Sequence, residues 1–504
     1  MTSLRLVRFA GALALGLLAL LRPAPAAATA DPARWRGFNL LEKFTLRQNA
    51  PYREEDFRWI AELGFNFVRL PIDYRCYTER DDWLNFKESV LREIDDAITY
   101  GTRHGVHVCL NLHRAPGFCI NPPAEPKDLW TDPEAQDAFV AHWAMLARRY
   151  RAIAPENLSF NLLNEPTRNT REAYLAVNRR AIEAIHREDP RRPVVVDGNN
   201  VGREPTSEFV ALPHVIQATR GYHPGTISHY RANWVKGSDR WPTPRWPGPV
   251  VVGRLYGPSK PDLRSPLVLR GDFPAGTELA IRIHQLSSKA RLQVRADSLP
   301  AGELLCDPRT QAAQWKPVPK DNGGWTYHEP VGERLFSVRL SAAARELALE
   351  NIEGDWLIFS ELRLQLPGRP AQTWETDQEW GRRQTTLDLA TDGTLRAPAG
   401  TRSDQMLRDY LQPWIKIAGQ GEQVFVGEFG CFNRTPHDVA LAWMRNWLEL
   451  WRDAGFGWAV WNFRGGFGIL DSGRTDVAYE DWRGHKLDRR MLELLQEFSG
   501  RTSP

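Results

Sequence analysis

Two glutamates stand at the ends of two apolar stretches that are far apart in the sequence. Leu158-Ser-Phe-Asn-Leu-Leu-Asn-Glu-Pro166 ends in an amide, the carboxylic acid Glu165 and a proline. Gln423-Val-Phe-Val-Gly-Glu-Phe-Gly430 repeats this design and ends in Glu428. A buried strand of this kind carries an acid to its C-terminal end, where a proline stops the sheet hydrogen bonding. Each glutamate alone could equally be a solvated loop residue. Two strands that both end in a glutamate, however, suggest a pair of acids that transfers protons.

The elements that would position these glutamates alternate between short strands and longer amphipathic helices. Eight such units close into a (β/α)8 barrel, whose chemistry sits at the C-terminal ends of its strands. An open, doubly wound sheet is the alternative, but no glycine-rich phosphate loop follows the first strand. The expected strands are 37–41, 65–71, 106–113, 158–165, 194–198, 215–222, 424–430 and 457–463, and the expected helices are 53–63, 89–104, 133–153, 171–189, 404–418, 436–454 and 488–498.

Residues 240–400 interrupt this alternation. A bridge rich in proline and tryptophan, Trp241-Pro-Thr-Pro-Arg-Trp-Pro-Gly-Pro249, leads into runs such as 278–284, 290–295 and 356–366 that alternate apolar and polar residues. This period of two predicts an antiparallel β-sandwich, inserted after the sixth barrel strand. We therefore expect a signal peptide at 1–30, a barrel built from 31–245 and 396–504, and an all-β sandwich domain at 246–395.

In the predicted barrel, several polar and aromatic residues fall at the C-terminal ends of the strands: Arg69, His113, Asn164, Glu165, Tyr222, Glu428 and Trp461. Two carboxylates across such a mouth suit glycoside hydrolysis, in which one acid protonates the leaving oxygen and the other attacks the anomeric carbon. A second negative charge nearby would raise the pKa of Glu165, whereas an arginine beside Glu428 would keep that group ionised. The pair could then hold different protonation states at one pH.

Five motifs together resemble glycoside hydrolase family 5, the cellulase-like family of retaining (β/α)8 barrels within clan A. The likeness covers roughly residues 31 to 240 and 400 to 500. The inserted segment resembles carbohydrate-binding β-sandwich modules, and a structural spacer is its alternative interpretation. The five motifs are Phe67-Val-Arg-Leu-Pro71, Leu110-Asn-Leu-His-Arg-Ala-Pro-Gly117, Leu163-Asn-Glu-Pro166, Val426-Gly-Glu-Phe-Gly430 and Trp458-Ala-Val-Trp-Asn-Phe463.

The resemblance implies a role for each matching residue. Glu165 would be the acid/base and Glu428 the nucleophile, with Asn164 contacting the sugar 2-hydroxyl. Arg69 and His113 would orient the nucleophile side, and Trp461 would lie under the sugar.

The family's His-x-Tyr pair after the sixth strand reads Arg220-Gly-Tyr222 here. The resemblance therefore keeps Tyr222 as a hydrogen-bond partner of the nucleophile but puts Arg220 where a histidine is usual. His223 and His229 are candidates to compensate, and Trp130, at the end of loop 119–130, is a further candidate for substrate contact.

Composition narrows the possible partners and the compartment. A net charge of +3 without long runs of one sign argues against nucleic acid or an anionic membrane as a partner, while 20 Trp residues suit the flat faces of sugar rings. A basic start, an apolar run and Ala28-Thr29-Ala30 predict a signal peptide and hence a soluble protein that is secreted or periplasmic. Five scattered cysteines fit no zinc site and leave at least one unpaired, with Cys76 and Cys119 as a conceivable disulfide.

The leading hypothesis is a secreted, monomeric retaining glycosidase that uses neither metal nor organic cofactor and acts on β-1,4-glucan. A mannanase, a β-1,3-glucan hydrolase or an exo-acting β-glucosidase or β-mannosidase type of enzyme are alternatives of the same family. A carbohydrate-binding protein without catalysis is the alternative from another class, since a fold does not fix a function.

Overall fold

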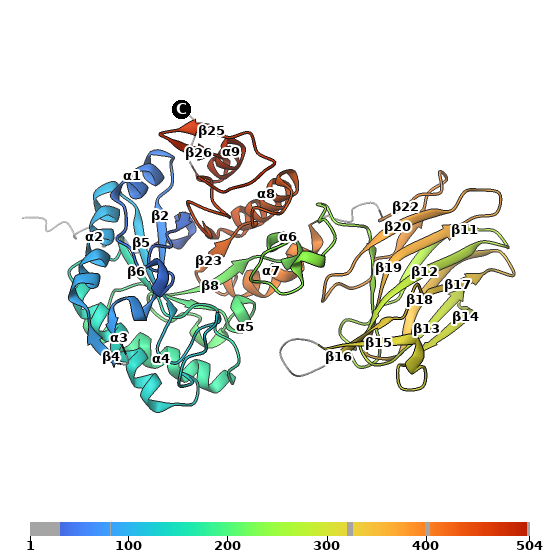
Figure 1. Ribbon diagram of the computed structural model, residues 1–504, viewed down its shortest axis with the longest axis horizontal. Coiled ribbons are helices and arrows are strands. Elements are labelled where there is room, and N and C mark those ends of the chain that lie inside the picture. Colours follow the sequence, from blue (N-terminus) through green and yellow to red (C-terminus); the bar gives the residue numbers. More distant parts are fainter. Residues whose placement is uncertain (1–30, 81, 320–325, 399–403, 501–504) are drawn as a thin grey trace, which may run out of the picture.

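The computed structural model describes residues 31–80, 82–319, 326–398 and 404–500, so the predicted signal peptide at 1–30 lies outside it. Eight parallel strands form a closed barrel, and the pairing of the last strand with the first excludes an open sheet (Figure 1). The predicted barrel is confirmed. In spatial order its strands are β1 (Arg36–Asn39), β2 (Phe67–Asp73), β5 (His107–Arg114), β6 (Leu158–Asn161), β7 (Val194–Asp197), β8 (Val215–Gly221), β23 (Val424–Phe429) and β24 (Gly457–Val460).

Helices surround the barrel, and those after β7 and β8 are only one turn long. Two small antiparallel hairpins lie outside the barrel sheet, β3 (Thr78–Glu79) with β4 (Asp82–Phe86) and β25 (Glu480–Trp482) with β26 (His485–Leu487). The helices are α1 (Glu54–Glu62), α2 (Glu88–His104), α3 (Pro133–Tyr150), α4 (Arg171–Glu188), α5 (Asn199–Gly202), α6 (Gly225–Ser228), α7 (Gln405–Ala418), α8 (His437–Ala454) and α9 (Arg489–Glu497).

The longer helices begin and end where local chemistry dictates. The Asp132 side chain accepts a hydrogen bond from the Ala135 N–H at 3.1 Å, and Pro133 occupies the first position of α3, where no N–H is needed. Helix α2 ends at Gly105, whose φ of 67° is the left-handed conformation that closes a helix. These caps leave short connections to the strands that follow.

The inside of the barrel is apolar at one end and polar at the other. At the N-terminal end, Trp35 stacks on Phe67 and His107 with ring centroids 4.9 and 4.4 Å apart. At the C-terminal end, Arg69 and Asn161 are buried in place of apolar side chains. The apolar plug supports a polar layer, and that layer is where a site can form.

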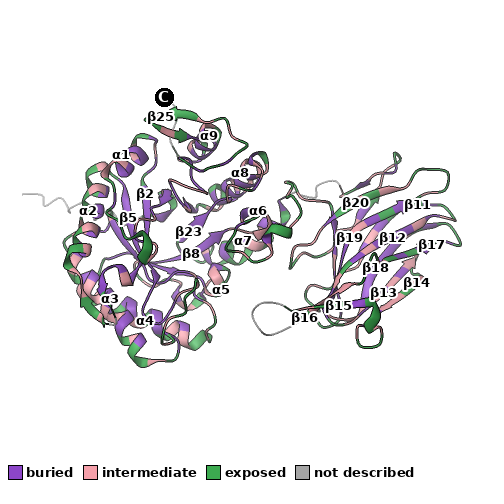
Figure 2. Cartoon of the chain, viewed as in Figure 1, coloured by how far each residue is buried: buried purple, intermediate pink, exposed green. Residues whose placement is uncertain are grey.

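The outer shell of the barrel contains many of the tryptophans. Trp443, Trp447 and Trp451 are fully buried along one face of α8, and Trp414 is buried on α7 (Figure 2). These four rings fill the space between helix and sheet, so they are packing residues and not platforms for a ligand.

A separate β-rich region lies between β8 and α7 in the chain and beside the barrel in space (Figure 1). Its two sheets share one hydrophobic core, to which β12 and β19 of the first sheet and β13 and β18 of the second all contribute. The first sheet comprises β9 (Val251–Val252), β10 (Arg254–Tyr256), β12 (Glu278–Leu286), β15 (Trp315–Pro319), β16 (Thr326–Pro330), β17 (Leu335–Arg339), β19 (Trp356–Gln365) and β20 (Gln372–Asp377). The second comprises β11 (Leu267–Phe273), β13 (Ala290–Ala296), β14 (Leu299–Cys306), β18 (Ala344–Gly354), β21 (Leu387–Leu389) and β22 (Leu395–Arg396).

All five cysteines are free, and four of them are buried. The conceivable disulfide between Cys76 and Cys119 is therefore absent; the Cys76 thiol instead lies against the Lys43 and Thr45 carbonyl oxygens. None of the helices within the described ranges is long and apolar enough to cross a membrane.

Candidate active site

The polar layer at the C-terminal end of the barrel brings residues from six strands together. Arg69 lies on β2, His113 on β5, Arg220 on β8 and Glu428 on β23. Strand β6 ends at Asn161, earlier than predicted, so Asn164 and Glu165 lie in the turn that follows it. Trp461 follows β24 directly. The loop position frees the Glu165 side chain from sheet geometry while the strand below stays rigid.

Glu428 is held by an arginine and a tyrosine. Arg69 donates from Nη1 to Glu428 Oε1 at 2.6 Å, and the Tyr222 hydroxyl donates to Oε2 at 3.2 Å. Burial raises the pKa of Tyr222 well above its ordinary value, and the charge of Glu428 adds to the effect, so the phenol keeps its proton. Both carboxylate oxygens are therefore oriented by donors, which aims the group into the barrel mouth.

Glu165 is held differently, through its backbone and a second arginine. Its N–H donates to Asp197 Oδ2 at 3.0 Å, and its φ of 50° lies in the left-handed region that a residue with a side chain seldom adopts. Arg220 Nε lies 3.3 Å from Glu165 Oε1. The pKa of Glu165 is raised to about 7, first by burial and then by the negative charge of Glu428, with the positive charge of Arg220 opposing the rise.

Arg220 and Asp197 form the link between the two glutamates. Arg220 donates from Nη2 to Asp197 Oδ2 and to Asn164 Oδ1, and the same nitrogen lies 3.6 Å from Glu428 Oε1. The positive charge of Arg220 thus lies within 4 Å of both carboxylates. Its own pKa is raised, since the attraction of Asp197 and the glutamates outweighs the cost of burial.

A closed ring of hydrogen bonds ties the two arginines together. Arg69 donates to Asn161 Oδ1 at 2.8 Å and to Asn164 Oδ1 at 2.8 Å, while Asn161 donates to Asp197 Oδ1 at 2.9 Å. Arg220 completes the ring by donating to both Asp197 and Asn164. Within the described residues Arg220 Nε has no hydrogen-bond partner, and it lies 3.3 Å from Glu165 Oε1.

The charges of this network balance when its three carboxyl groups hold one proton. Arg69 and Arg220 are two cations, and Asp197 and Glu428 are two anions, all of them at most 3 % exposed. Glu165 is the fifth ionisable group, and a proton on it leaves the buried group neutral. Since unpaired charge is costly to bury, this count agrees with the raised pKa of Glu165.

Asn164, His113 and Trp461 form the wall beside this network. The Asn164 oxygen faces the two arginines, so its Nδ2 points to His113 Nε2 at 3.4 Å. Burial lowers the pKa of His113 well below its ordinary value, and Arg69 lowers it further, so the imidazole is neutral. The centroid of the Trp461 ring lies 5.5 Å from that of His113 and 5.3 Å from that of Phe44. These two ring contacts hold the indole at the mouth of the barrel.

The two histidines proposed to compensate for Arg220 lie in aromatic contacts near the network. The His223 ring stacks on Tyr410 at 4.9 Å, and His229 packs edge-on against Tyr222 at 5.0 Å with its Nδ1 bonded to Ser228. Burial lowers the pKa of both to about 4, so neither carries a charge near neutral pH. Arg220 itself contacts both glutamates, and compensation by either histidine stays a prediction.

Trp130 is buried and packs against Phe118 at 5.4 Å. Within the described residues its indole Nε1 has no hydrogen-bond partner.

Three residues of the network were missed in the sequence. Asp197 ends the strand Val194-Val-Val-Asp197, which has the same apolar run and terminal acid as the strand of Glu428. This shared pattern could have identified Asp197 as a candidate site residue. Asn39 and Asn161 sit inside strands that read as core, and only the structure shows their oxygens accepting from Arg69.

Comparisons with known proteins show which families and structures this chain resembles. Residues 26–237 match the family model described as Cellulase (glycosyl hydrolase family 5), a range that includes Glu165 and ends before Glu428. A crystal structure titled as that of a glycoside hydrolase is 27 % identical, with a TM-score of 0.59 over 92 % of this chain and 99 % of that one. Over residues 26–237 the chain is similar to glycosyl hydrolase family 5.

Curated relatives are similar to this chain over part of its length. Endoglucanase C of Acetivibrio thermocellus is 29 % identical over 184 residues, which is 36 % of this chain and 53 % of that protein. Cellodextrinase A of Ruminococcus flavefaciens is 28 % identical over 189 residues, 36 % of this chain and 54 % of its own length. The chain thus spans about half the length of the curated relatives that it matches.

Proposed function

We propose that this chain is a retaining glycoside hydrolase that cleaves β-glycosidic bonds of a glycan, with β-1,4-glucan as the first candidate substrate. The observation that carries the proposal is the asymmetric pair of glutamates. Glu428 has a cationic partner at 2.6 Å, whereas the pKa of Glu165 is raised to about 7. One carboxylate is thus prepared to attack and the other to give a proton at the same pH.

The reaction follows as a double displacement. Glu428 attacks the anomeric carbon and forms a glycosyl ester, while the proton of Glu165 passes to the leaving oxygen and the C–O bond breaks. Glu165, now a carboxylate, takes a proton from water, whose oxygen attacks the same carbon and releases Glu428. Asn164 can donate from Nδ2 to a sugar hydroxyl because its oxygen is already occupied by the two arginines.

Several further assignments rest on the same proposal. Two of the relatives are named endoglucanase C and cellodextrinase A. These names support β-1,4-glucan as the substrate ahead of the mannan, β-1,3-glucan and exo-acting alternatives. We also propose export after cleavage of residues 1–30, action as a monomer, and a division into a barrel of 31–245 and 396–504 with an inserted domain at 246–395. The intact carboxylate pair disfavours the alternative of a binding protein without catalysis.

The experiment is the replacement of each glutamate by glutamine. Glu428→Gln and Glu165→Gln should each lower kcat on soluble β-glucan by several orders of magnitude. Azide should restore cleavage of an activated aryl glycoside by the Glu165 variant, since that leaving group needs no acid and the azide anion attacks the glycosyl ester without a base, releasing Glu428 and a glycosyl azide. Glu125→Gln is a matched control, because Glu125 is a buried glutamate paired with Arg114 outside the network. Full activity in either glutamine variant would refute the proposal.

A further inference from the structure

A loop of the β-rich region touches the barrel close to the active site. It connects β20 to β21 and spans residues 378–386. The Glu379 N–H donates to Asp377 Oδ1 at 2.9 Å, which ties the start of the loop to the end of β20. Two residues further on, the Gly381 N–H donates to the Tyr256 hydroxyl at 2.6 Å. Because these bonds fix the backbone of the loop to its own region, Glu379 is held in a defined position.

The Glu379 side chain meets helix α6 of the barrel. The Thr226 hydroxyl donates to Glu379 Oε2 at 3.2 Å, although the two residues are 153 positions apart in the chain. The pKa of Glu379 is raised to about 7, first by burial and then by the negative charge of Asp377, while the Thr226 hydrogen bond opposes the rise. A carboxyl group accepts a hydrogen bond whether or not it carries a proton, so the contact persists on both sides of that pH.

Helix α6 is joined to the backbone of Tyr222, four residues before Thr226. The Ser228 hydroxyl donates to the Tyr222 carbonyl oxygen at 2.6 Å. In the same segment, Trp443 and Trp447 of α8 each donate from Nε1 at 3.1 Å to the carbonyl oxygen of the residue after Tyr222. The tyrosine is thus held between α6 and α8.

The loop that follows Glu428 is held by the same helix. The Thr435 hydroxyl, in the loop after β23, donates to the Ile227 carbonyl oxygen of α6 at 2.6 Å. A shift of α6 would therefore reach both partners of the 3.2 Å hydrogen bond between Tyr222 and Glu428. Hydrogen bonds weaken steeply with distance and misalignment, so small shifts of this kind matter.

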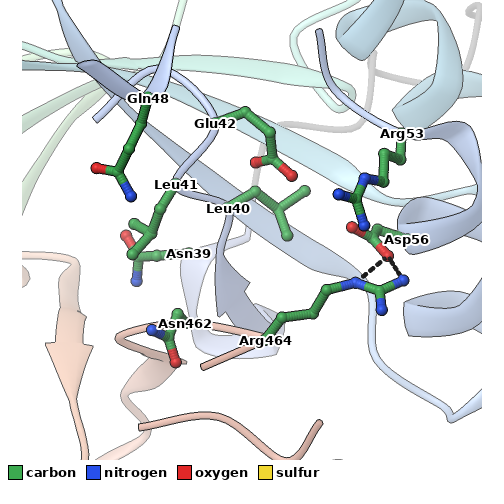
Figure 3. Close-up of a pocket in the computed structure, with 9 residues that line it drawn as sticks. All are labelled: Asn39, Leu40, Leu41, Glu42, Gln48, Arg53, Asp56, Asn462 and Arg464. Carbon is green, nitrogen blue, oxygen red and sulfur yellow. Dashed lines mark hydrogen bonds and ion pairs between the residues drawn. The ribbon is translucent and has the colours of Figure 1, made fainter. Parts of the chain in front are cut away.

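The other oxygen of Glu428 is supported from inside the barrel. Arg69 donates to Glu428 Oε1 and to Asn39 Oδ1, at 2.6 and 3.0 Å. Figure 3 shows Asn39 in the wall of a cavity whose nine lining residues all belong to the barrel. The Oε1 side of the nucleophile therefore has its support within the barrel, whereas the β-rich region reaches the Oε2 side through α6.

We propose that Glu379 is a positioning residue, through which the β-rich region holds α6 by way of Thr226. By this route it maintains the hydrogen bond from Tyr222 to Glu428. The inference rests on the proposed function and gives the β-rich region a part in catalysis from outside the barrel. It requires that a change at Glu379 lowers kcat only while Tyr222 has its hydroxyl group.

The test is a double-mutant cycle of Glu379→Ala and Tyr222→Phe in the full chain, with kcat and KM measured on a soluble β-glucan. Glu379→Ala should lower kcat about three- to tenfold, the usual effect of one lost hydrogen bond. It should leave KM within about twofold, because the affected bond acts on the nucleophile and not on the substrate. In the Tyr222→Phe background the same change should leave kcat unaltered, because the hydroxyl that it displaces is already absent.

Three further variants check the route. Thr226→Val removes the donor from the barrel side of the contact and should lower kcat by the same factor as Glu379→Ala. Glu379→Gln should recover most of that loss, because its amide oxygen still accepts from Thr226. Glu375→Ala is the matched control: Glu375 lies on β20 of the same region but pairs with Arg245, at 3.3 Å. It should keep the wild-type kcat.

The outcomes separate this inference from the proposed function. An unchanged kcat in both Glu379→Ala and Thr226→Val would overturn the inference, and so would an equal loss with and without the Tyr222 hydroxyl. The same loss in Glu375→Ala would also overturn it, since general loosening of the region would then be the cause. Failure of Glu428→Gln to abolish cleavage of the same glucan would instead refute the function. Melting temperatures within about 3 °C of the wild type check that each variant is folded.

Discussion

Arg220 gives the sharpest prediction, because its charge and that of Asp197 act on Glu165 in opposite directions. Arg220 lowers the pKa of Glu165 and Asp197 raises it, around a value of about 7. The first step needs the protonated acid, so kcat/KM should fall as pH rises above that value. Arg220→Met should therefore move the alkaline limb upward in pH, and Asp197→Asn should move it downward.

The magnitude follows from the geometry. Arg220 Nε lies 3.3 Å from Glu165 Oε1, where two unit charges interact by about 5 kcal/mol at an effective dielectric constant of about 20. The shift that a single neighbouring charge causes in a protein is smaller than this Coulomb value, at about 1–3 pKa units. We expect a net shift of about 1–2 pH units upward for Arg220→Met, or about 1.4–2.7 kcal/mol. The downward shift for Asp197→Asn should be about 1 unit by the same argument.

The assay is the pH dependence of kcat/KM between pH 5 and about 9.5 on an unactivated oligosaccharide, whose leaving group needs the acid. Both replacements roughly keep side-chain volume, and thermal unfolding checks the fold of each variant. Limbs that stay at the wild-type pH in both variants would refute the reasoning. So would limbs that move in the same direction, because a merely structural role for the pair would not separate them.

Three further changes test other parts of the molecule. Tyr222→Phe removes the hydroxyl that donates to Glu428 Oε2 and should lower kcat about 10- to 100-fold in steady-state kinetics; an unchanged kcat would contradict its role. Trp461→Ala removes the indole at the mouth and should raise KM for oligosaccharides more than it lowers kcat, measured in the same assay. Burial lowers the pKa of His107 from 6.5 to about 4, so the unfolded chain binds this proton before the folded protein does as the pH falls. The free energy of unfolding should therefore be unaffected by His107 above pH 6.5 and should drop by up to about 3 kcal/mol toward pH 4. Denaturant titrations should show a smaller drop for His107→Gln, and equal drops would exclude His107 as the source.

The barrel and the positions of its two glutamates were predictable because the sequence patterns that indicate them span only a few neighbouring residues. Strand-helix alternation reports a parallel sheet, and an acid at the end of an apolar run reports the strand end, as for Glu165 and Glu428. The Arg220 network was not predictable, because its bonds join strands that lie 23 residues or more apart in sequence. Asn161 illustrates the limit, since a polar residue inside a short strand indicates neither a partner nor a direction until the neighbouring strand is in place.

The β-rich region has a consequence for how the chain is made. Strands β8 and β23 pair in the barrel, yet Val424 comes 203 positions after Gly221 in the chain. At a synthesis rate of about 5–20 residues per second, the ribosome needs roughly 10–40 seconds to cover that interval. During this time the β8 edge has no β23 to pair with, and an open edge is prone to pair with other chains. Early folding of the β-rich region, which has its own core, would bring Gly221 and the chain leading to β23 close together and so shorten the last search that closes the barrel.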